Sequence, residues 1–425
     1  MNSNMKQTSL KRIDLLRSQI TVNKCMNNRK PTASSDDDIV IVSYCRTALG
    51  KAGKGSFKDT MPEILTSHVI KELLARGNCK GDKVQEIVFG NVLSSGAGFM
   101  SSRMAQFLAG IPEETSLMSV NRLCSSGLQA VMNVAYSIAS KQIDVGIGGG
   151  VESMSLFDMN NLVDGEKIAE AVFDTPKASN CMIPMGITSE NVAEQFKVDR
   201  ITQDTIACDS HKKAQHAQTQ GWFKDEIVPV KTTIKDKEGN LKEITVDKDE
   251  GIRPQTTMQT LGKMKGAFKQ GGTCTAGNSS QVTDGAAGVL LARRSVAKSL
   301  GLPIVGRIIG YAVAGVPPEI MGIGPAFAIP EVLKNVGMTM NDIDIVELNE
   351  AFASQASYCI NKLNIPMDKI NPRGGAIALG HPLGCTGARQ FSTLLSELKR
   401  TNKKRGMISM CIGTGMGAAC VLERE

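Results

Sequence analysis

The feature that most constrains the fold is a regular alternation of strand-like and helix-like stretches that begins at Ile39. Short runs of β-branched and apolar residues predict strands at 39–44, 86–92, 117–121 and 144–150. Apolar residues at helical spacing predict helices at 62–75, 101–109 and 126–140. Strands that are separated by helices favour a mainly parallel sheet with helices on both faces. We therefore expect an α/β fold.

The same alternation returns in the second half of the chain, from Pro303 onward. The strand-like run at 344–349 corresponds to the run at 86–91, and the glycine-ended run at 406–413 corresponds to that at 144–150. A single match could arise by chance, but the preserved order indicates a duplicated α/β half. We expect two similar sheets that pack through shared helices.

An excursion of about 155–285 separates the two halves. It contains the only tryptophan, Trp222, and one clear helix predicted at 204–220. Long ordered excursions of this kind commonly carry function. His211 and His216 lie five residues apart on that helix, off the i, i+4 spacing of a metal site. We expect both histidines to be solvated surface residues.

Cys124 lies where the predicted strand 117–121 gives way to the predicted helix 126–140. The free backbone N–H groups and the dipole at a helix N-terminus favour negative charge. A thiol at such a junction is expected to have a lowered pKa and to form a thiolate more readily. The alternative is an ordinary cysteine that packs as a small core residue.

Three stretches of the second half carry further candidate chemistry. Asn349 follows a predicted strand and precedes a predicted helix. His381 lies in the glycine-rich stretch 374–387, where neighbouring glycine and proline would hold the imidazole in a rigid loop. Cys411 ends a predicted strand, and the glycines that follow it, beginning with Gly413, could let backbone N–H groups face a ligand.

Charge and cysteine usage exclude several classes of function. Of the net charge of +7, residues 1–35 contribute +6 through seven basic residues and one acidic residue, which leaves +1 for the body. A nearly neutral body has no electrostatic footprint for nucleic acid. The eleven cysteines include no Cys-x-x-Cys pair and no zinc spacing, so we expect neither a disulfide scaffold nor a metal site. No apolar run approaches the ~18 residues of a membrane span.

The basic segment 1–35 reads as a targeting or flexible tail and is set aside from the fold. Arg12-Ile13, five residues, then Gln19-Ile20 resembles an N-terminal peroxisomal import signal, which predicts an import receptor as a partner. A mitochondrial transit peptide or a plain flexible tail are the alternatives. We favour the peroxisome.

Together these stretches resemble the thiolase family from about Ile39 to the C-terminus, and within it the peroxisomal β-oxidation branch. The motifs stand in the family's order: Cys124-Ser-Ser-Gly, Asn349-Glu-Ala-Phe, Gly380-His381-Pro and Cys411-x-Gly413-x-Gly415. The resemblance implies a layered αβαβα core of two duplicated halves with an inserted loop domain. It divides the chain into the tail at 1–35, an N-terminal half at 36–295 with the loop domain, and a C-terminal half at 296–425.

The resemblance also implies a reaction, the cleavage of 3-ketoacyl-CoA by CoA in fatty acid β-oxidation. Cys124 would be the nucleophile, His381 the base, and Cys411 the acid that protonates the departing acetyl-CoA carbanion. One oxyanion site would use His381 and a water held by Asn349, and the other the backbone N–H groups of Cys124 and Gly413.

Coenzyme A enters this scheme as a co-substrate, without a permanently bound cofactor or metal. By resemblance the nucleotide side of CoA would meet Arg253, although an ordinary surface ion pair is the alternative for that residue. The other expected contacts are Ser280 with pantetheine, apolar walls from Phe268 and Met321, and Met185 at the acyl pocket. The family also leads us to expect a homodimer.

Other functions remain open on the motifs alone. An acetoacetyl-CoA thiolase would share all four motifs, and a non-catalytic thiolase-like lipid carrier would be expected to lack one. Ketoacyl synthases pair their cysteine with two histidines, whereas Cys411 stands where the second imidazole would be. Cys181 lies four residues before Met185, so oxidation that links it to Cys124 is a further hypothesis.

Overall fold

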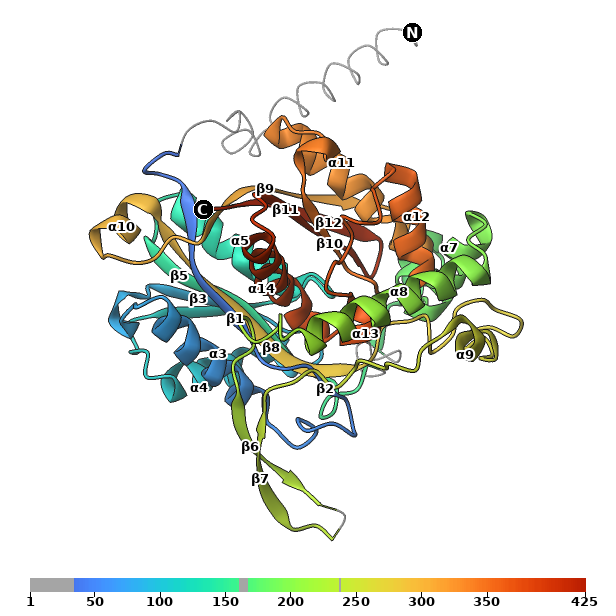
Figure 1. Cartoon of the computed structure of the whole chain (residues 1–425), viewed down its shortest axis with the longest axis horizontal. Helices are drawn as coiled ribbons and strands as arrows, with labels where there is room; N and C mark the ends of the chain where they lie inside the picture. Colours follow the sequence, from blue (N-terminus) through green and yellow to red (C-terminus); the bar gives the residue numbers. More distant parts are fainter. Residues whose placement is uncertain (1–33, 160–166, 237) are drawn as a thin grey trace, which may run out of the picture.

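The computed structural model describes residues 34–159, 167–236 and 238–425. The expectations for the tail therefore lie almost wholly outside the described residues. In that described part, ten strands form one mixed sheet that is built from two similar halves, with a separate two-stranded hairpin (Figure 1).

The first half of the sheet has the order β1-β8-β5-β3-β4, and the short strand β2 (Gly50–Lys51) pairs with β8. Its strands are β1 (Ile39–Arg46), β3 (Glu86–Gly90), β4 (Ser116–Val120), β5 (Val145–Ser153) and β8 (Thr283–Arg293). β3 is parallel to β4 and β5, whereas β8 runs antiparallel to both β5 and β1. The sheet is therefore mixed and not mainly parallel as expected, because strands such as β8 run opposite to both of their neighbours.

The second half repeats this plan with the order β9-β12-β11-β10. Its strands are β9 (Gly306–Gly315), β10 (Ile345–Leu348), β11 (Arg405–Ile412) and β12 (Met416–Arg424). β10 and β11 are parallel, β12 is antiparallel to β11 and β9, and a parallel bridge from Val346 to Ile370 stands where the first half has β4. The duplication expected from the sequence is confirmed, and two residue pairs between β1 and β9 join the halves at one edge.

Helices cover and separate the two halves to give five layers, α-β-α-β-α (Figure 1). Helix α3 (Pro62–Arg76) packs on β1 and β8 on the outside of the first half, beside α4 (Phe99–Leu108). Helix α11 (Pro325–Val336) packs on β9 and β12 outside the second half, beside α12 (Ala353–Leu363). The central layer consists of α5 (Ser126–Ala139) and α14 (Leu383–Arg400), and α14 contacts strands of both halves.

The two central helices approach each other backbone to backbone near their N-termini. A Cβ atom on Gly127 of α5 would lie 2.6 Å from the carbonyl oxygen of Gly384 in α14. A Cβ atom on Gly150 of β5 would lie 1.9 Å from the same oxygen, so neither position has room for a side chain. This close packing brings the N-terminus of α5, just after Cys124, next to the N-terminus of α14, just after His381.

The excursion between β5 and β8 is more structured than its sequence predicted. It holds α7 (Met185–Gln195), the expected long helix α8 (Arg200–Thr219), the short α9 (Met258–Gly262), and a hairpin of β6 (Val230–Lys235) and β7 (Leu241–Val246). Helix α8 packs on α12 and on the short α13 (Ala376–Leu379) of the second half, whereas the segment around Ile227 bridges to Arg46 of β1 in the first half. None of the described helices is long and apolar enough to cross a membrane.

The prediction for His211 was wrong. His211 is buried at 3% exposure, and its Nδ1 accepts a hydrogen bond from the backbone N–H of Arg253 at 3.1 Å. Burial, with the charge of Arg253, lowers the pKa of His211 to about 4. The helical pattern alone could not reveal that the segment around Arg253 covers this face of α8. His216 is exposed, as expected, and packs edge-on against Trp222.

Candidate active site

A tight turn before α5 sets the position of Cys124. Leu123 has a left-handed backbone (φ 46°), and Ser126 closes the turn by accepting from the Arg122 N–H at 2.9 Å and donating to the Leu123 carbonyl at 2.7 Å. Cys124 thus comes two residues before the first residue of α5, and it is 8% exposed. The predicted strand-to-helix junction is confirmed.

The expected lowering of the Cys124 pKa is not found. Burial raises the pKa of the thiol to about 11, and hydrogen bonds from the backbone of Gly413 and of Cys124 itself lower it only in part. The helix N-terminus therefore does not outweigh desolvation. Because the resting thiol stays protonated, a base must remove its proton during the reaction.

His381 is held as a neutral imidazole with a defined tautomer. Its Nδ1 lies 2.6 Å from Thr386 Oγ1, and the Thr386 hydroxyl donates its own proton to the Pro382 carbonyl at 3.1 Å. Nδ1 must therefore carry the hydrogen that Thr386 accepts, which makes Nε2 the acceptor nitrogen of the ring. Burial and the nearby Arg389 charge lower the pKa of His381 to about 3.

Asn349 faces that acceptor nitrogen from the end of β10. Its side-chain Nδ2 lies 3.4 Å from His381 Nε2, and its backbone N–H donates to the Ser409 carbonyl at 2.9 Å. The side chain is fully buried, and its Oδ1 has no partner among the described residues. A buried carbonyl oxygen of this kind is an acceptor available to a substrate or a water molecule.

Cys411 and Gly413 lie at the end of β11, next to the turn that carries Cys124. The Cys411 thiol is fully buried, and burial, followed by the charge of Cys124, raises its pKa well above the usual range. A Cβ atom on Gly413 would lie 2.9 Å from Leu123 Cδ1, so this glycine sits against the turn that carries Cys124. The structure brings the two thiols together, and because each disfavours the ionisation of the other, only one thiolate is expected at a time.

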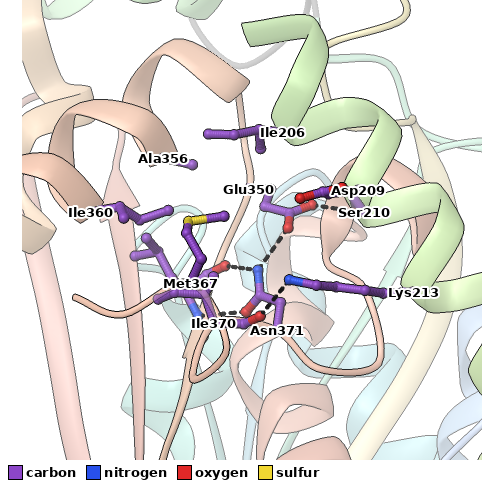
Figure 2. A pocket seen from close by; sticks show the side chains of 11 residues that line it. Ile206, Asp209, Ser210, Lys213, Glu350, Ala356, Ile360, Met367, Ile370 and Asn371 are labelled. Atoms are coloured by element: carbon purple, nitrogen blue, oxygen red, sulfur yellow. Dashed lines mark hydrogen bonds between the residues drawn. The ribbon is translucent and has the colours of Figure 1, made fainter. Parts of the chain in front are cut away.

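Glu350 anchors the turn that presents Asn349. Its buried carboxylate accepts from Ser210 Oγ of α8 at 2.6 Å and from Asn371 Nδ2 at 2.7 Å (Figure 2). It also accepts from the backbone N–H of Ile377 in α13, in the segment that leads to His381. Ser210, Glu350 and Asn371 line a narrow cavity. Glu350 thus connects helix α8 of the excursion with the turn that carries Asn349 and with the segment that leads to His381.

Comparison with known proteins identifies the family. The family description "Thiolase, N-terminal domain" matches residues 39–295, and "Thiolase, C-terminal domain" matches residues 302–424. The chain belongs to the thiolase family.

Individual thiolases are similar over nearly the whole chain. The peroxisomal 3-ketoacyl-CoA thiolase A of Rattus norvegicus is 58% identical over 394 residues, which cover 92% of this chain and 90% of the rat protein. The crystal structure of the dimeric peroxisomal thiolase of Saccharomyces cerevisiae has a TM-score of 0.86 at 48% identity and covers 92% of this chain and 99% of that one. The crystal structure of an acetyl-CoA acetyltransferase of Bacillus anthracis has a TM-score of 0.82 at 37% identity. The match covers 91% of this chain and 99% of that one.

Two of the residues expected to contact CoA pack next to Cys411. Met185 and Met321 pack in the apolar cluster around Cys411. Phe268 is 40% exposed and meets Phe352, which packs on that cluster, edge to face at 5.8 Å. Their roles toward a ligand stay predictions.

Ser280 and Arg253 lie on the segments that lead toward the base. Ser280 is half-buried, and its backbone N–H donates to the Ala351 carbonyl at 3.0 Å. Arg253 is half-buried and donates from Nη2 to Gln281 Oε1 at 3.3 Å. The Gln281 carbonyl in turn accepts from the backbone N–H of His381 at 3.0 Å. The roles of Ser280 and Arg253 toward CoA stay predictions.

The structure adds residues to this thiolase site that sequence reasoning missed. Thr386 orients His381, and Glu152 holds the loops around the site. For Thr386 the available signal was a polar residue in the first turn of the helix after His381. For Glu152 it was a carboxylate shortly after the glycine-rich run 144–150. Cys181 is exposed and Cys124 is buried, and both thiols are free, so their oxidative pairing stays a hypothesis. No group of three or more potential metal ligands occurs in the described ranges.

Proposed function

We propose that this thiolase cleaves 3-ketoacyl-CoA with CoA, giving acetyl-CoA and an acyl-CoA shortened by two carbons, through an acyl intermediate on Cys124. The observation that carries the proposal is the close approach of two buried thiols, Cys124 and Cys411, at the end of β11. The neighbouring strand β10 ends before Asn349, which faces Nε2 of the neutral His381 imidazole. The relatives named 3-ketoacyl-CoA thiolases support this substrate class.

The first half of the reaction attacks the 3-keto carbon. His381 Nε2 takes the Cys124 proton as the sulfur attacks, because the resting pair is neutral. The backbone N–H groups of Cys124 and Gly413 would stabilise the alkoxide that forms. The C2–C3 bond then breaks, leaving the acyl group on Cys124 and the enolate of acetyl-CoA, whose oxygen His381 Nε2–H and a water on Asn349 would hold.

The second half restores the enzyme. Cys411 protonates C2 of the enolate, acetyl-CoA leaves, and the proton on His381 returns to the Cys411 thiolate. Incoming CoA then gives its thiol proton to His381 and attacks the acyl carbonyl. Cys124 departs as a thiolate and recovers the proton from His381. A thiol suits the role of Cys411 because its proton can be given in this direction and taken up in the reverse, condensing direction.

A direct assay tests this proposal. We expect CoA-dependent loss of the 3-ketoacyl-CoA absorbance with the native protein and none with Cys124→Ala. For Asn349→Ala, the loss of one oxyanion contact is expected to lower kcat by about 10²–10³-fold. Equal inactivity of the native protein and Cys124→Ala on both medium-chain and acetoacetyl substrates would overturn the enzyme proposal and favour a lipid carrier.

An acetoacetyl-CoA thiolase is the second candidate, because an acetyl-CoA acetyltransferase shares this fold at 37% identity. The same catalytic groups would serve both enzymes. A profile of rate against acyl chain length separates them, since an acetoacetyl enzyme would lose activity as the chain lengthens.

The exposed residues of α4 support a homodimer. This helix and the neighbouring β4 leave large apolar side chains uncovered, namely Phe99, Met100, Met104, Phe107, Leu108 and Met118. An apolar patch next to an edge strand is typical of an interface between subunits. A mass measurement in solution tests this, with a dimer expected, and the dimeric yeast relative agrees with it.

We propose that the enzyme is peroxisomal and that the tail at 1–35 directs its import. We also propose that the C-terminal half of the chain starts near residue 296. The peroxisomal relatives support this compartment. A reporter fused to residues 1–35 should collect in peroxisomes, and the change Arg12→Ala should release it. Collection in mitochondria would refute the import-signal reading.

A further inference from the structure

Glu152 is a buried carboxylate at the end of β5, next to the last residue of the strand. The side chain is fully buried, and four hydrogen bonds reach it, none from a cationic group. The donors are Asn91 Nδ2 at 3.1 Å, Val92 N at 3.1 Å, Leu93 N at 3.2 Å and Gly384 N at 2.9 Å. All four groups are donors and favour the ionised carboxylate, which offsets part of the effect of burial, and the pKa of Glu152 is raised to about 7.

On one side Glu152 fixes the helix that follows the catalytic base. Gly384 is the second residue of α14, and the N-cap residue Pro382 provides no capping side chain. Glu152 therefore supplies, from another part of the chain, the acceptor and the negative charge that a helix N-terminus favours. His381 lies only three residues before Gly384.

On the other side Glu152 reaches the turn of the nucleophile. The Val92 N–H donates to Glu152, and the Val92 carbonyl accepts from Asn121 Nδ2 at 3.2 Å. Asn121 Oδ1 in turn accepts from the backbone N–H of Leu123 at 2.9 Å, directly before Cys124. A continuous series of hydrogen bonds thus runs from the His381 segment to the Cys124 turn, with Glu152 at its centre.

We propose that Glu152 is a positioning residue that sets the relative placement of Cys124 and His381. The inference rests on the proposed thiolase mechanism. The titratable groups that interact electrostatically with Cys124 are Glu152 from β5 and Cys411 from β11. Burial and two backbone hydrogen bonds have the largest effects on the Cys124 pKa. The charge of Glu152 comes next, and it raises that pKa.

The change Glu152→Gln tests this proposal. A glutamine has one acceptor oxygen, so its NH₂ group would face two of the four N–H donors. We expect kcat to fall about tenfold or more with KM for the 3-ketoacyl-CoA within about twofold of native. We also expect the pH profile of Cys124 alkylation by iodoacetamide to move to lower pH, because a buried negative charge no longer opposes the thiolate.

Two further variants separate positioning from folding. Asn121→Ala breaks the link to the Cys124 turn and keeps the Glu152 charge, so kcat should fall while the alkylation profile stays in place. Glu423→Gln is the matched control, since Glu423 is a buried carboxylate that accepts from Arg307 and Arg405 at the far end of β12. It should lower stability and leave kcat unchanged.

The outcomes distinguish the two proposals. Native kcat and an unmoved alkylation profile in Glu152→Gln would overturn the positioning role, as would a loss of activity that only tracks the folded fraction. If Glu152→Gln does not fold, an unchanged kcat in Asn121→Ala overturns the role. If the native protein shows no thiolysis, the proposed function fails, whereas the alkylation profiles still test the effect of Glu152 on Cys124.

Discussion

The hydroxyl of Thr386 is a small group with a large expected effect. It accepts from His381 Nδ1 and donates to the Pro382 carbonyl, so it fixes both the tautomer and the orientation of the imidazole. An imidazole without that partner could rotate or carry its hydrogen on Nε2, and Nε2 could then no longer take the Cys124 proton.

We predict that Thr386→Val lowers kcat. A hydrogen bond that supports an imidazolium contributes about 1.5–3 kcal/mol, which corresponds to a roughly 10- to 100-fold decrease. Thr393→Val is the matched control, because Thr393 is a buried threonine on the same helix that donates to Glu226. Steady-state kinetics should show the loss only for Thr386→Val, and an equal loss in both variants would contradict the orienting role.

At the scale of single residues, the motifs identified the candidate reactive side chains but did not predict how deeply they are buried. Motif order singled out Cys124, His381 and Cys411, and the structure places the first and last of these close together. The predicted lowering of the Cys124 pKa failed because burial depends on α14 and β11, segments more than 250 residues away in the chain. The same reason explains His211, which is covered by the segment around Arg253.

At the scale of elements, periodicity predicted β1, β3, β4, β5, β10 and β11 within a few residues, but it did not predict the core strands β8, β9 and β12. It missed α7 and the hairpin of β6 and β7, since short segments in a loop-rich excursion carry weak patterns. Helix α14 is buried on nearly all sides, so its polar residues need partners from distant segments, as Arg389 finds in Glu347 at 3.1 Å. Such partners cannot be inferred from local spacing.

The contact of α8 with the Asn349 turn gives a prediction for an element. Ser210→Ala removes a hydrogen bond to the buried Glu350 and the acceptor for the Gly375 N–H. A buried group left without its partner costs about 1–3 kcal/mol. Urea unfolding should show a loss of that size, whereas Ser299→Ala, on the exposed helix α10 (Arg294–Ser299), should change stability little. Equal stability of Ser210→Ala and native protein would contradict an anchoring role for this contact.

At the scale of the whole molecule, burial of the site makes stability depend on pH. The pKa of His381 is about 3 in the folded protein and 6.5 ordinarily, so below pH 6.5 the unfolded chain binds a proton that the folded chain does not. Stability is therefore lost as the pH falls. The buried carboxyls of Glu152 and Glu347, whose pKa values burial raises to about 7, act in the opposite direction.

A comparison with His381→Asn isolates the histidine. Between pH 7 and pH 5 the native protein should lose about 2 kcal/mol more unfolding free energy than the variant, because the carboxyl contributions are common to both. Denaturant titrations at the two pH values measure this difference. A difference near zero would show that His381 is not held neutral by burial.

The most direct test of the central claim, that Cys124 carries the acyl group, is intact mass analysis after mixing the protein with a 3-ketoacyl-CoA in the absence of free CoA. The account predicts release of acetyl-CoA together with an acyl adduct shortened by two carbons, mapped to the Cys124 peptide and discharged by added CoA. Turnover without an adduct on Cys124, or an adduct on another residue, would contradict it.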